Sequence, residues 1–218
     1  LVEAVAIGAV QNAIDPVQET LRRVTAIVLA AGAGTRMEGR IKQLLDWQGT
    51  TLLGHALDIV RGAEVSQRLL VLGSNADLIS AQVDLERFQV VPNPGWEEGR
   101  ASSVRAGLRS VSERSDAAIF VNADQPFLTS EVIRTVIQKY YQTNAPVVVP
   151  VYHNQRGSPM LFARPMFMLM DELRGEDGGR ELLQQLADRL VQVTIDDERA
   201  AVDIDTFNEY ERAKGMIN

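Results

Sequence analysis

Short apolar runs alternate along the chain with segments whose apolar residues recur at helical spacing. The first strong run, residues 24–30, is rich in β-branched residues and stops at glycines, which is typical of a buried strand in a parallel sheet. The alternation predicts βαβ units, and therefore an α/β fold with a mainly parallel sheet covered by helices. Further strands are expected over residues 69–72, 89–91, 117–121 and 147–151, and helices from about Ala76, over 101–111 and over 130–141.

Beyond Pro150 the pattern becomes looser and predicts a short strand over Met160–Ala163, a helix near 179–190, and a final strand and helix. No internal repeat or low-complexity linker divides residues 24–218, which we expect to form a single domain. Residues 1–23 follow no such pattern and do not begin with Met. We interpret them as an N-terminal extension, an expression remnant or the tail of a neighbouring domain, and assign them no function.

Polar residues before the helical segments predict their N-caps. Ser130 is expected to cap the helix that contains Glu131, and Asn75 or Asp77 an earlier helix, the one from about Ala76.

The composition narrows the range of partners. The chain carries 29 acidic and 22 basic side chains without a long run of either sign, which argues against a nucleic-acid or membrane surface and favours a small molecule. The absence of cysteine excludes disulfides and thiolate chemistry, so a metal would have oxygen ligands. No apolar run reaches the roughly 18 residues of a membrane span, and no leader pattern opens the chain, so we expect a cytoplasmic location.

A glycine-rich loop follows the first strand directly, where an open α/β sheet places its ligand crevice. Small residues allow backbone amides to approach a triphosphate closely, and Arg36 and Lys42 add positive charge. The loop lacks the third glycine of a dinucleotide-binding fold and the Gly-Lys-Ser/Thr of a P-loop. The alternative interpretation is a simple tight turn. The loop residues are Ala30, Ala31, Gly32, Ala33, Gly34, Thr35 and Arg36.

Carboxylates mark two later strands, one at its end and one along its length. Asp124 comes just after the strand over 117–121, and a single strand-end aspartate is sufficient to anchor Mg²⁺ or Mn²⁺ beside substrate phosphates. Asp203 and Asp205 are two residues apart, which would place both on one side of a strand, and one of them could complete the metal site. Alternatively, Asp124 caps a turn, and Asp205 or Thr206 caps the last helix near Phe207.

Five segments in this order resemble the molybdenum cofactor cytidylyltransferases. They are the glycine-rich loop, Lys42, the Asn93-Pro94-Gly95-Trp96 stretch with Gly99 to Gly107, Asp124-Gln125-Pro126, and Asp203-Ile204-Asp205-Thr206. The resemblance implies a Rossmann-like three-layer nucleotidyltransferase fold and transfer of CMP from CTP to molybdopterin with release of pyrophosphate. It also implies a recipient molybdenum hydroxylase as a possible partner.

The resemblance assigns roles to residues. Arg36, Lys42 and Asp124 would be catalytic, with Asp124 and Asp205 as metal ligands. The nucleotide would be bound by Ala30, Ala31, Gly32, Ala33, Gly34, Thr35, Arg36, Lys42, Gly99, Ser102 and Ser103. The acceptor would be bound by Gly157, Ser158, Pro159, Gly178 and Arg180, in segments where this chain departs from the usual family motifs.

Several alternatives stay open at this point. Ser102 or Ser103 could instead cap the helix that follows, and Ala31 favours cytosine over guanine only by analogy with the guanylyltransferases of the same pathway. Competing functions are a cytidylyltransferase of the methylerythritol phosphate type, a sugar-phosphate nucleotidyltransferase, and a molybdenum cofactor chaperone with little catalysis.

An acceptor phosphate is already anionic near neutral pH, so the reaction needs no histidine base. We accordingly interpret His55 and His153 as a packing and a loop residue. Trp96 either stacks on a ligand ring or anchors its loop, and the methionines at 166, 168 and 170 are expected to fill the core or the acceptor groove.

Overall fold

The computed structural model describes residues 23–176 and 180–217, and they form a three-layer α/β structure. The central sheet has the strand order β10-β7-β9-β6-β1-β4-β5, with β8 paired to β7. Its strands are β1 (Val24–Leu29), β4 (Gln67–Leu72), β5 (Gln89–Pro92), β6 (Ala117–Asn122), β7 (Val147–Tyr152), β8 (Gln155–Arg156), β9 (Met160–Ala163) and β10 (Leu190–Thr194). A separate antiparallel pair is formed by β2 (Asp46–Trp47) and β3 (Thr50–Thr51).

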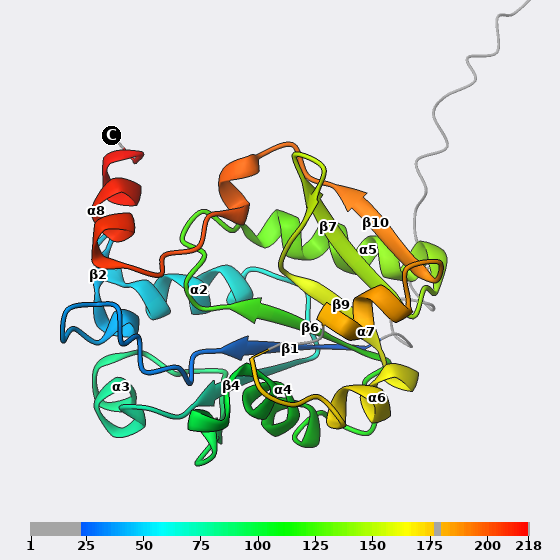
Figure 1. The fold of residues 1–218 in the computed structure, drawn as a ribbon, viewed down its shortest axis with the longest axis horizontal. Coiled ribbons are helices and arrows are strands. Elements are labelled where there is room, and N and C mark those ends of the chain that lie inside the picture. The colour runs from blue at the N-terminus through cyan, green and yellow to red at the C-terminus, as the bar shows by residue number, and fades with distance from the viewer. Residues whose placement is uncertain (1–22, 177–179, 218) are drawn as a thin grey trace, which may run out of the picture.

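Helices cover both faces of this sheet, with α2 and α5 on one side and α4 and α6 on the other (Figure 1). The helices are α2 (Leu52–Arg61), α3 (Ala76–Gln82), α4 (Arg100–Arg109), α5 (Ser130–Thr143), α6 (Phe167–Asp171), α7 (Arg180–Gln185) and α8 (Phe207–Gly215). Within the described chain, no helix combines the length and the apolar character that crossing a membrane requires.

The sheet is mixed but mainly parallel, as predicted. β1 pairs in parallel with both β4 and β6, whereas β9 runs antiparallel to β6 and β7. In the β1–β6 register, Leu29 lies opposite Asn122. The segments that leave the carboxyl ends of β1 and β6 therefore start side by side, which brings the glycine-rich loop close to Asp124.

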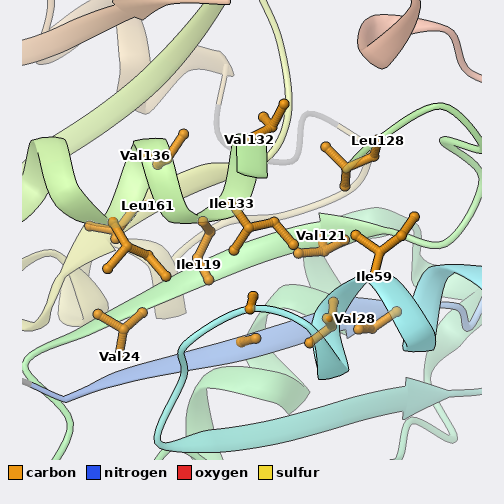
Figure 2. Packing of buried hydrophobic residues seen from close by; sticks show 14 of the residues in the cluster. Val24, Val28, Ile59, Ile119, Val121, Leu128, Val132, Ile133, Val136 and Leu161 are labelled. Carbon is orange, nitrogen blue, oxygen red and sulfur yellow. The ribbon is translucent and has the colours of Figure 1, made fainter. Parts of the chain in front are cut away.

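Two apolar clusters hold the layers together, one on each face of the sheet. Figure 2 shows the first, in which Ile119 and Val121 of β6 pack with Ile133 and Val136 of α5. Alternate residues of one buried strand supply the two clusters, because successive side chains point to opposite faces. This period explains why β1 contributes Val28 to the first cluster and Ile27 to the second.

A third, smaller cluster attaches the end of the chain to the region after the glycine-rich loop. Met37 and Trp47 pack there against Ile204 and Tyr210, and the Tyr210 hydroxyl donates to the Asp46 carbonyl at 2.7 Å. This packing holds the segment before α8 next to the loop that follows β1.

Local chemistry differs from the prediction at several helix starts. Thr129, not Ser130, caps α5 by accepting from the Val132 amide, while the Ser130 hydroxyl donates to the Ile59 carbonyl. Asn75 occupies the N-cap position of α3 but makes no side-chain capping bond. Thr206 caps α8 in a full capping box with Glu209, so the prediction for Asp205 or Thr206 is confirmed for Thr206.

The boundaries of the later elements also differ. The helix predicted near 179–190 is shorter and spans Arg180–Gln185. Asp203 and Asp205 do not lie on a strand, because residues 202–205 pass along the site as an irregular segment. It is held by the Ile204 amide, which donates to the Asp124 carbonyl at 3.0 Å.

Candidate active site

The glycine-rich loop continues directly from β1. The Ala30 amide still donates to Val71 in β4, after which the chain leaves the sheet. Gly34 has a φ of 61°, and a Cβ there would lie 3.2 Å from the Cβ of Lys42. A glycine thus allows the loop to turn back tightly against Lys42.

Gln43 supports the loop from within the protein. Its Nε2 donates to the carbonyls of Ala30 and Gly32, at 2.9 Å in each case, and its side chain is only 6% exposed. Both carbonyls accept from one amide, so the side chain fixes the path of the loop on either side of Ala31. No local sequence signal distinguishes Gln43, although it adjoins the predicted Lys42.

Four of the predicted charged residues converge beside this loop. Lys42 Nζ lies 2.7 Å from Asp124 Oδ2 and 3.4 Å from Asp205 Oδ1. Arg36 Nη2 lies 3.4 Å from Asp205 Oδ2. Lys42 is the least accessible of the four, with 13% of its side chain exposed, so its ammonium group is held in place rather than free in solvent.

The carboxylates suit a divalent cation that keeps part of its coordination for substrate and water. Asp124 and Asp205 both approach Lys42, and the buried Oδ1 of Asp124 has no hydrogen-bond partner among the described residues. Residues 23–176 and 180–217 contain no group of three or more His, Cys, Asp or Glu side chains arranged around a metal. Mg²⁺ commonly uses one or two carboxylates together with phosphate oxygens, which fits this pair.

Asp203 belongs to the same acidic region but differs from its neighbours. Partial removal from water and the nearby charges of Asp124 and Asp205 raise its pKa to about 6, although solvent still reaches the side chain. Asp205, not Asp203, contacts Lys42.

A cleft of about 420 Å³ is lined by Arg36, Lys42, Asp124 and Asp205, but not by Asp203. Its size is typical of a small-molecule pocket. The other walls come from the segment around Trp96 and Gly99 and from Glu176 after α6. Among the predicted nucleotide-binding residues, the cleft is lined by Ala30, Ala31, Gly32, Gly34, Thr35, Arg36, Lys42, Gly99 and Ser103.

The start of α4 forms another wall of the cleft. Ser102 and Ser103 both accept from the Asn93 amide, at 2.9 and 3.0 Å, and Ser102 donates to the Gly99 carbonyl. Neither serine is the N-cap, which is Gly99. Ser102 and Ala33 do not belong to the lining residues, so Ser102 supports this wall while Ser103 faces the cleft.

Gly99 also lets the segment after α6 approach closely. A Cβ on Gly99 would lie 2.7 Å from the Gly175 carbonyl carbon, and the Ala101 amide donates to the Gly175 oxygen at 2.9 Å. This contact brings Glu176 into the cleft wall, which local sequence signals had not indicated.

The predicted acceptor segment lies beyond the start of α4. Ser158 is buried. Its hydroxyl accepts a hydrogen bond from the Asn122 side-chain amide at 3.2 Å, and its carbonyl accepts one from the Tyr152 hydroxyl at 2.6 Å. Its neighbours Gly157 and Pro159 lie between β8 and β9. Gly178 lies outside the described residues, and Arg180 is the first residue of α7, with a side chain that is not described.

Several other predictions concerned packing. His55 contacts the Pro126 carbonyl at 3.0 Å, and His153 pairs with exposed Glu198, so the structure brings neither into the cleft. Trp96 faces the cleft and also packs against the second apolar cluster. The methionines at positions 166 and 170 are buried, whereas the one at position 168 is 82% exposed and fills no core.

Comparison with known proteins assigns this arrangement to a family. The model of the MobA-like NTP transferase domain matches residues 26–190. The chain belongs to this family. The match begins in β1 and reaches the first residue of β10, so it includes the glycine-rich loop, Lys42 and Asp124.

Among similar solved structures, one covers almost the same length. Rv0371c from Mycobacterium tuberculosis H37Rv superposes with a TM-score of 0.80 at 30% identity, over 88% of this chain and 98% of that one. A structure of Rv0371c in complex with manganese has a TM-score of 0.73 at 28% identity, over 87% and 97% of the two chains. The predicted Rossmann-like nucleotidyltransferase fold is therefore confirmed.

One similar protein is named as an oxidoreductase, not as a transferase. Nicotine blue oxidoreductase from Paenarthrobacter nicotinovorans is 28% identical over 202 residues, which are 87% of this chain and 95% of that protein.

Proposed function

We propose that this MobA-like protein transfers CMP from CTP to the terminal phosphate of a molybdopterin-type acceptor and releases pyrophosphate. The observation that carries the proposal is the shared cleft of the glycine-rich loop, Lys42 and Asp124. A loop that exposes backbone amides beside two cations suits a polyphosphate, and the facing carboxylates suit its metal.

The donor would lie with its phosphates along the glycine-rich loop, close to Arg36 and Lys42. Gly99 and Ser103 on another wall would contact the base and ribose, because glycine permits close approach and a hydroxyl can both donate and accept. The preference for cytosine is supported by the five segments that resemble cytidylyltransferases. Asp124 is followed by Gln125-Pro126, which argues against the methylerythritol phosphate type.

In the reaction, an oxygen of the acceptor phosphate attacks the α-phosphorus of CTP, and the bond from that phosphorus to the α,β-bridging oxygen breaks. Lys42 and Arg36, which line the cleft, would neutralise the negative charge that develops on the departing pyrophosphate. The acceptor oxygen is already anionic, so no residue has to remove its proton.

Asp124 and Asp205 would hold Mg²⁺ or Mn²⁺, which when bound offsets the charge of the phosphates. Two observations favour this pair over Asp203: Asp124 Oδ1 has no hydrogen-bond partner in the described part of the chain, and both carboxylates contact Lys42. The manganese complex of Rv0371c, a protein of similar fold, supports the proposal of a divalent cation.

The test uses the full chain with Mg²⁺, purified molybdopterin, and CTP, GTP or ATP in parallel, with pyrophosphate release as the readout. We expect the highest rate with CTP. A higher rate with GTP would show that GTP, not CTP, is the donor. Binding of CTP and molybdopterin without turnover would favour the chaperone function. Transfer to methylerythritol phosphate or a sugar phosphate, but not to molybdopterin, would replace the acceptor.

The relationship to nicotine blue oxidoreductase favours redox chemistry as a second candidate. The glycine-rich loop lacks the glycine spacing of a dinucleotide-binding fold, which argues against a nicotinamide cofactor at this site. Incubation with nicotine blue and a reduced nicotinamide dinucleotide, followed by absorbance, tests it. Reduction without any pyrophosphate release in the first assay would favour this candidate.

A further inference from the structure

We infer that Arg100 binds the attacking phosphate of the acceptor and thereby selects phosphomonoesters as acceptors. The inference rests on the proposed nucleotidyl transfer. It adds a residue that neither the family motifs nor the loop chemistry had indicated.

The cations of the cleft are unequally paired. Of the three cations that line it, Arg36 pairs with Asp205, and Lys42 pairs with Asp124 and Asp205. Arg100 lines the same cleft and forms no ion pair with residues 23–176 or 180–217, and the charge of Asp203 acts on it only over a longer distance than an ion pair. The guanidinium group of Arg100 can therefore bind an anionic ligand.

Hydrogen bonds hold the guanidinium group of Arg100 in position. Arg100 Nη2 donates to Asn122 Oδ1 at 2.5 Å, and Asn122 Nδ2 donates to Ser158 Oγ at 3.2 Å. Asn122 is buried at the end of β6, so this chain of hydrogen bonds starts from a fixed point. A guanidinium carries five N–H donors, and one bond to Asn122 leaves a pair for bidentate binding of a phosphate.

Arg100 lies between two subsites. Arg100 lines the main cleft and also a small adjoining cavity of about 20 Å³. That cavity is otherwise mostly apolar, with Leu29, Phe120 and Phe162 in its walls and Ser158 at one side. Room for about one atom beyond the guanidinium favours an acceptor whose phosphate is bound by Arg100 while a small part of its body contacts the apolar wall.

This placement also suits the chemistry. If Arg100 binds two oxygens of a phosphate dianion, the third is free to attack the α-phosphorus of a nucleotide on the loop side of the cleft. A neutral hydroxyl acceptor would gain nothing from the guanidinium. The inference therefore predicts that inorganic phosphate, the smallest such anion, binds to the protein when the donor subsite is filled.

The experiment titrates inorganic phosphate by calorimetry into the full chain saturated with Mg²⁺ and α,β-methylene-CTP, which blocks transfer. Arg100→Met removes the charge, and we expect it to weaken phosphate binding by at least about tenfold because a bidentate charge-assisted contact is lost. Arg100→Lys keeps the charge but lacks the paired N–H donors of a guanidinium, so its phosphate affinity should lie between those of the wild type and Arg100→Met. Arg109→Gln, on the same helix but outside the cleft, should bind as the wild type does.

Two further readouts separate this inference from a structural effect and from the proposed function. Affinity for the CTP analogue and the melting temperature should be nearly unchanged in Arg100→Met. In Arg100→Met, the KM for molybdopterin should rise about tenfold or more, while the KM for CTP should stay the same.

Equal phosphate affinity in wild type and Arg100→Met, or no phosphate binding to the wild type, would overturn the inference. If phosphate binding depends on Arg100 but the protein transfers no CMP to molybdopterin, the inference is supported and only the proposed acceptor is refuted. A common loss of CTP and phosphate binding in Arg100→Met would show a structural role instead.

Discussion

Replacing Gln43 by Met tests whether this side chain holds the glycine-rich loop in shape. The substitution keeps the length and apolar stem of the side chain but removes the amide that donates to the carbonyls of Ala30 and Gly32. Ala30 is buried, so its carbonyl would lose its partner in a place that water does not easily reach, whereas the exposed Gly32 can be hydrated again.

The magnitude follows from these two bonds. An orphaned buried carbonyl costs about 1–3 kcal/mol and a lost bond that water replaces about 1 kcal/mol. Against this, Gln43 Oε1 is buried without a partner among the described residues, and removing it returns about 1 kcal/mol. We therefore expect Gln43→Met to lower the free energy of unfolding by about 1–3 kcal/mol.

The loop should also become less ordered before the nucleotide binds. Fixing one residue costs about 1–2 kcal/mol, so ordering even one or two loop residues on binding would weaken CTP affinity by about tenfold or more. Urea unfolding measures the stability and calorimetry with Mg²⁺ and CTP the affinity. Gln82→Met, an exposed glutamine in α3, is the matched control and should change stability by less than about 0.5 kcal/mol. If Gln43→Met matched this control in both measurements, the role of the two hydrogen bonds would be refuted.

The remaining predictions concern the charges, the metal, the last helix and the core. Lys42→Ala and Asp124→Ala should each lower turnover at least about a hundredfold while circular dichroism stays native; near-normal Mg²⁺-dependent activity of Asp124→Ala would remove the metal assignment. Chelation with EDTA should abolish pyrophosphate release, and added Mg²⁺ or Mn²⁺ should restore it; activity that survives chelation would contradict the metal site. Thr206→Ala should cost about 1 kcal/mol in urea unfolding because the capping box of α8 is lost, whereas Thr206→Ser should not. Leu57→Ala should cost about 2–5 kcal/mol, since Leu57 is fully buried in α2, and a loss below about 1 kcal/mol would contradict the packing described.

The positions of the strands and the nature of their ends could be predicted from the sequence. β1 and β6 are apolar runs that stop at distinctive residues, and such patterns act over a few neighbouring positions. Parallel pairing then puts the glycine-rich loop and Asp124 at one edge of the sheet, as expected. The family resemblance reached the same residues through their order along the chain.

Local errors arose where two adjacent residues have similar propensities. Ser130 and Thr129 are both good N-caps, and the sequence does not say which of them has the extended backbone that capping needs. The choice between Asp203 and Asp205 stayed open for a different reason, because the strand expected over these residues does not form.

The sequence by itself determined most strands of the central sheet, several of its helices, the glycine-rich loop and its two cations, because periodicity and small residues act through near neighbours. Only the tertiary structure decided that Asp205 reaches Lys42, that Glu176 joins the cleft wall and that Arg100 lines it without an ionic partner among the described residues. These outcomes depend on contacts between distant segments, such as Ile204 with Asp124 and Ala101 with Gly175. Such contacts form only when the whole core packs, so no pattern of neighbouring residues can specify them.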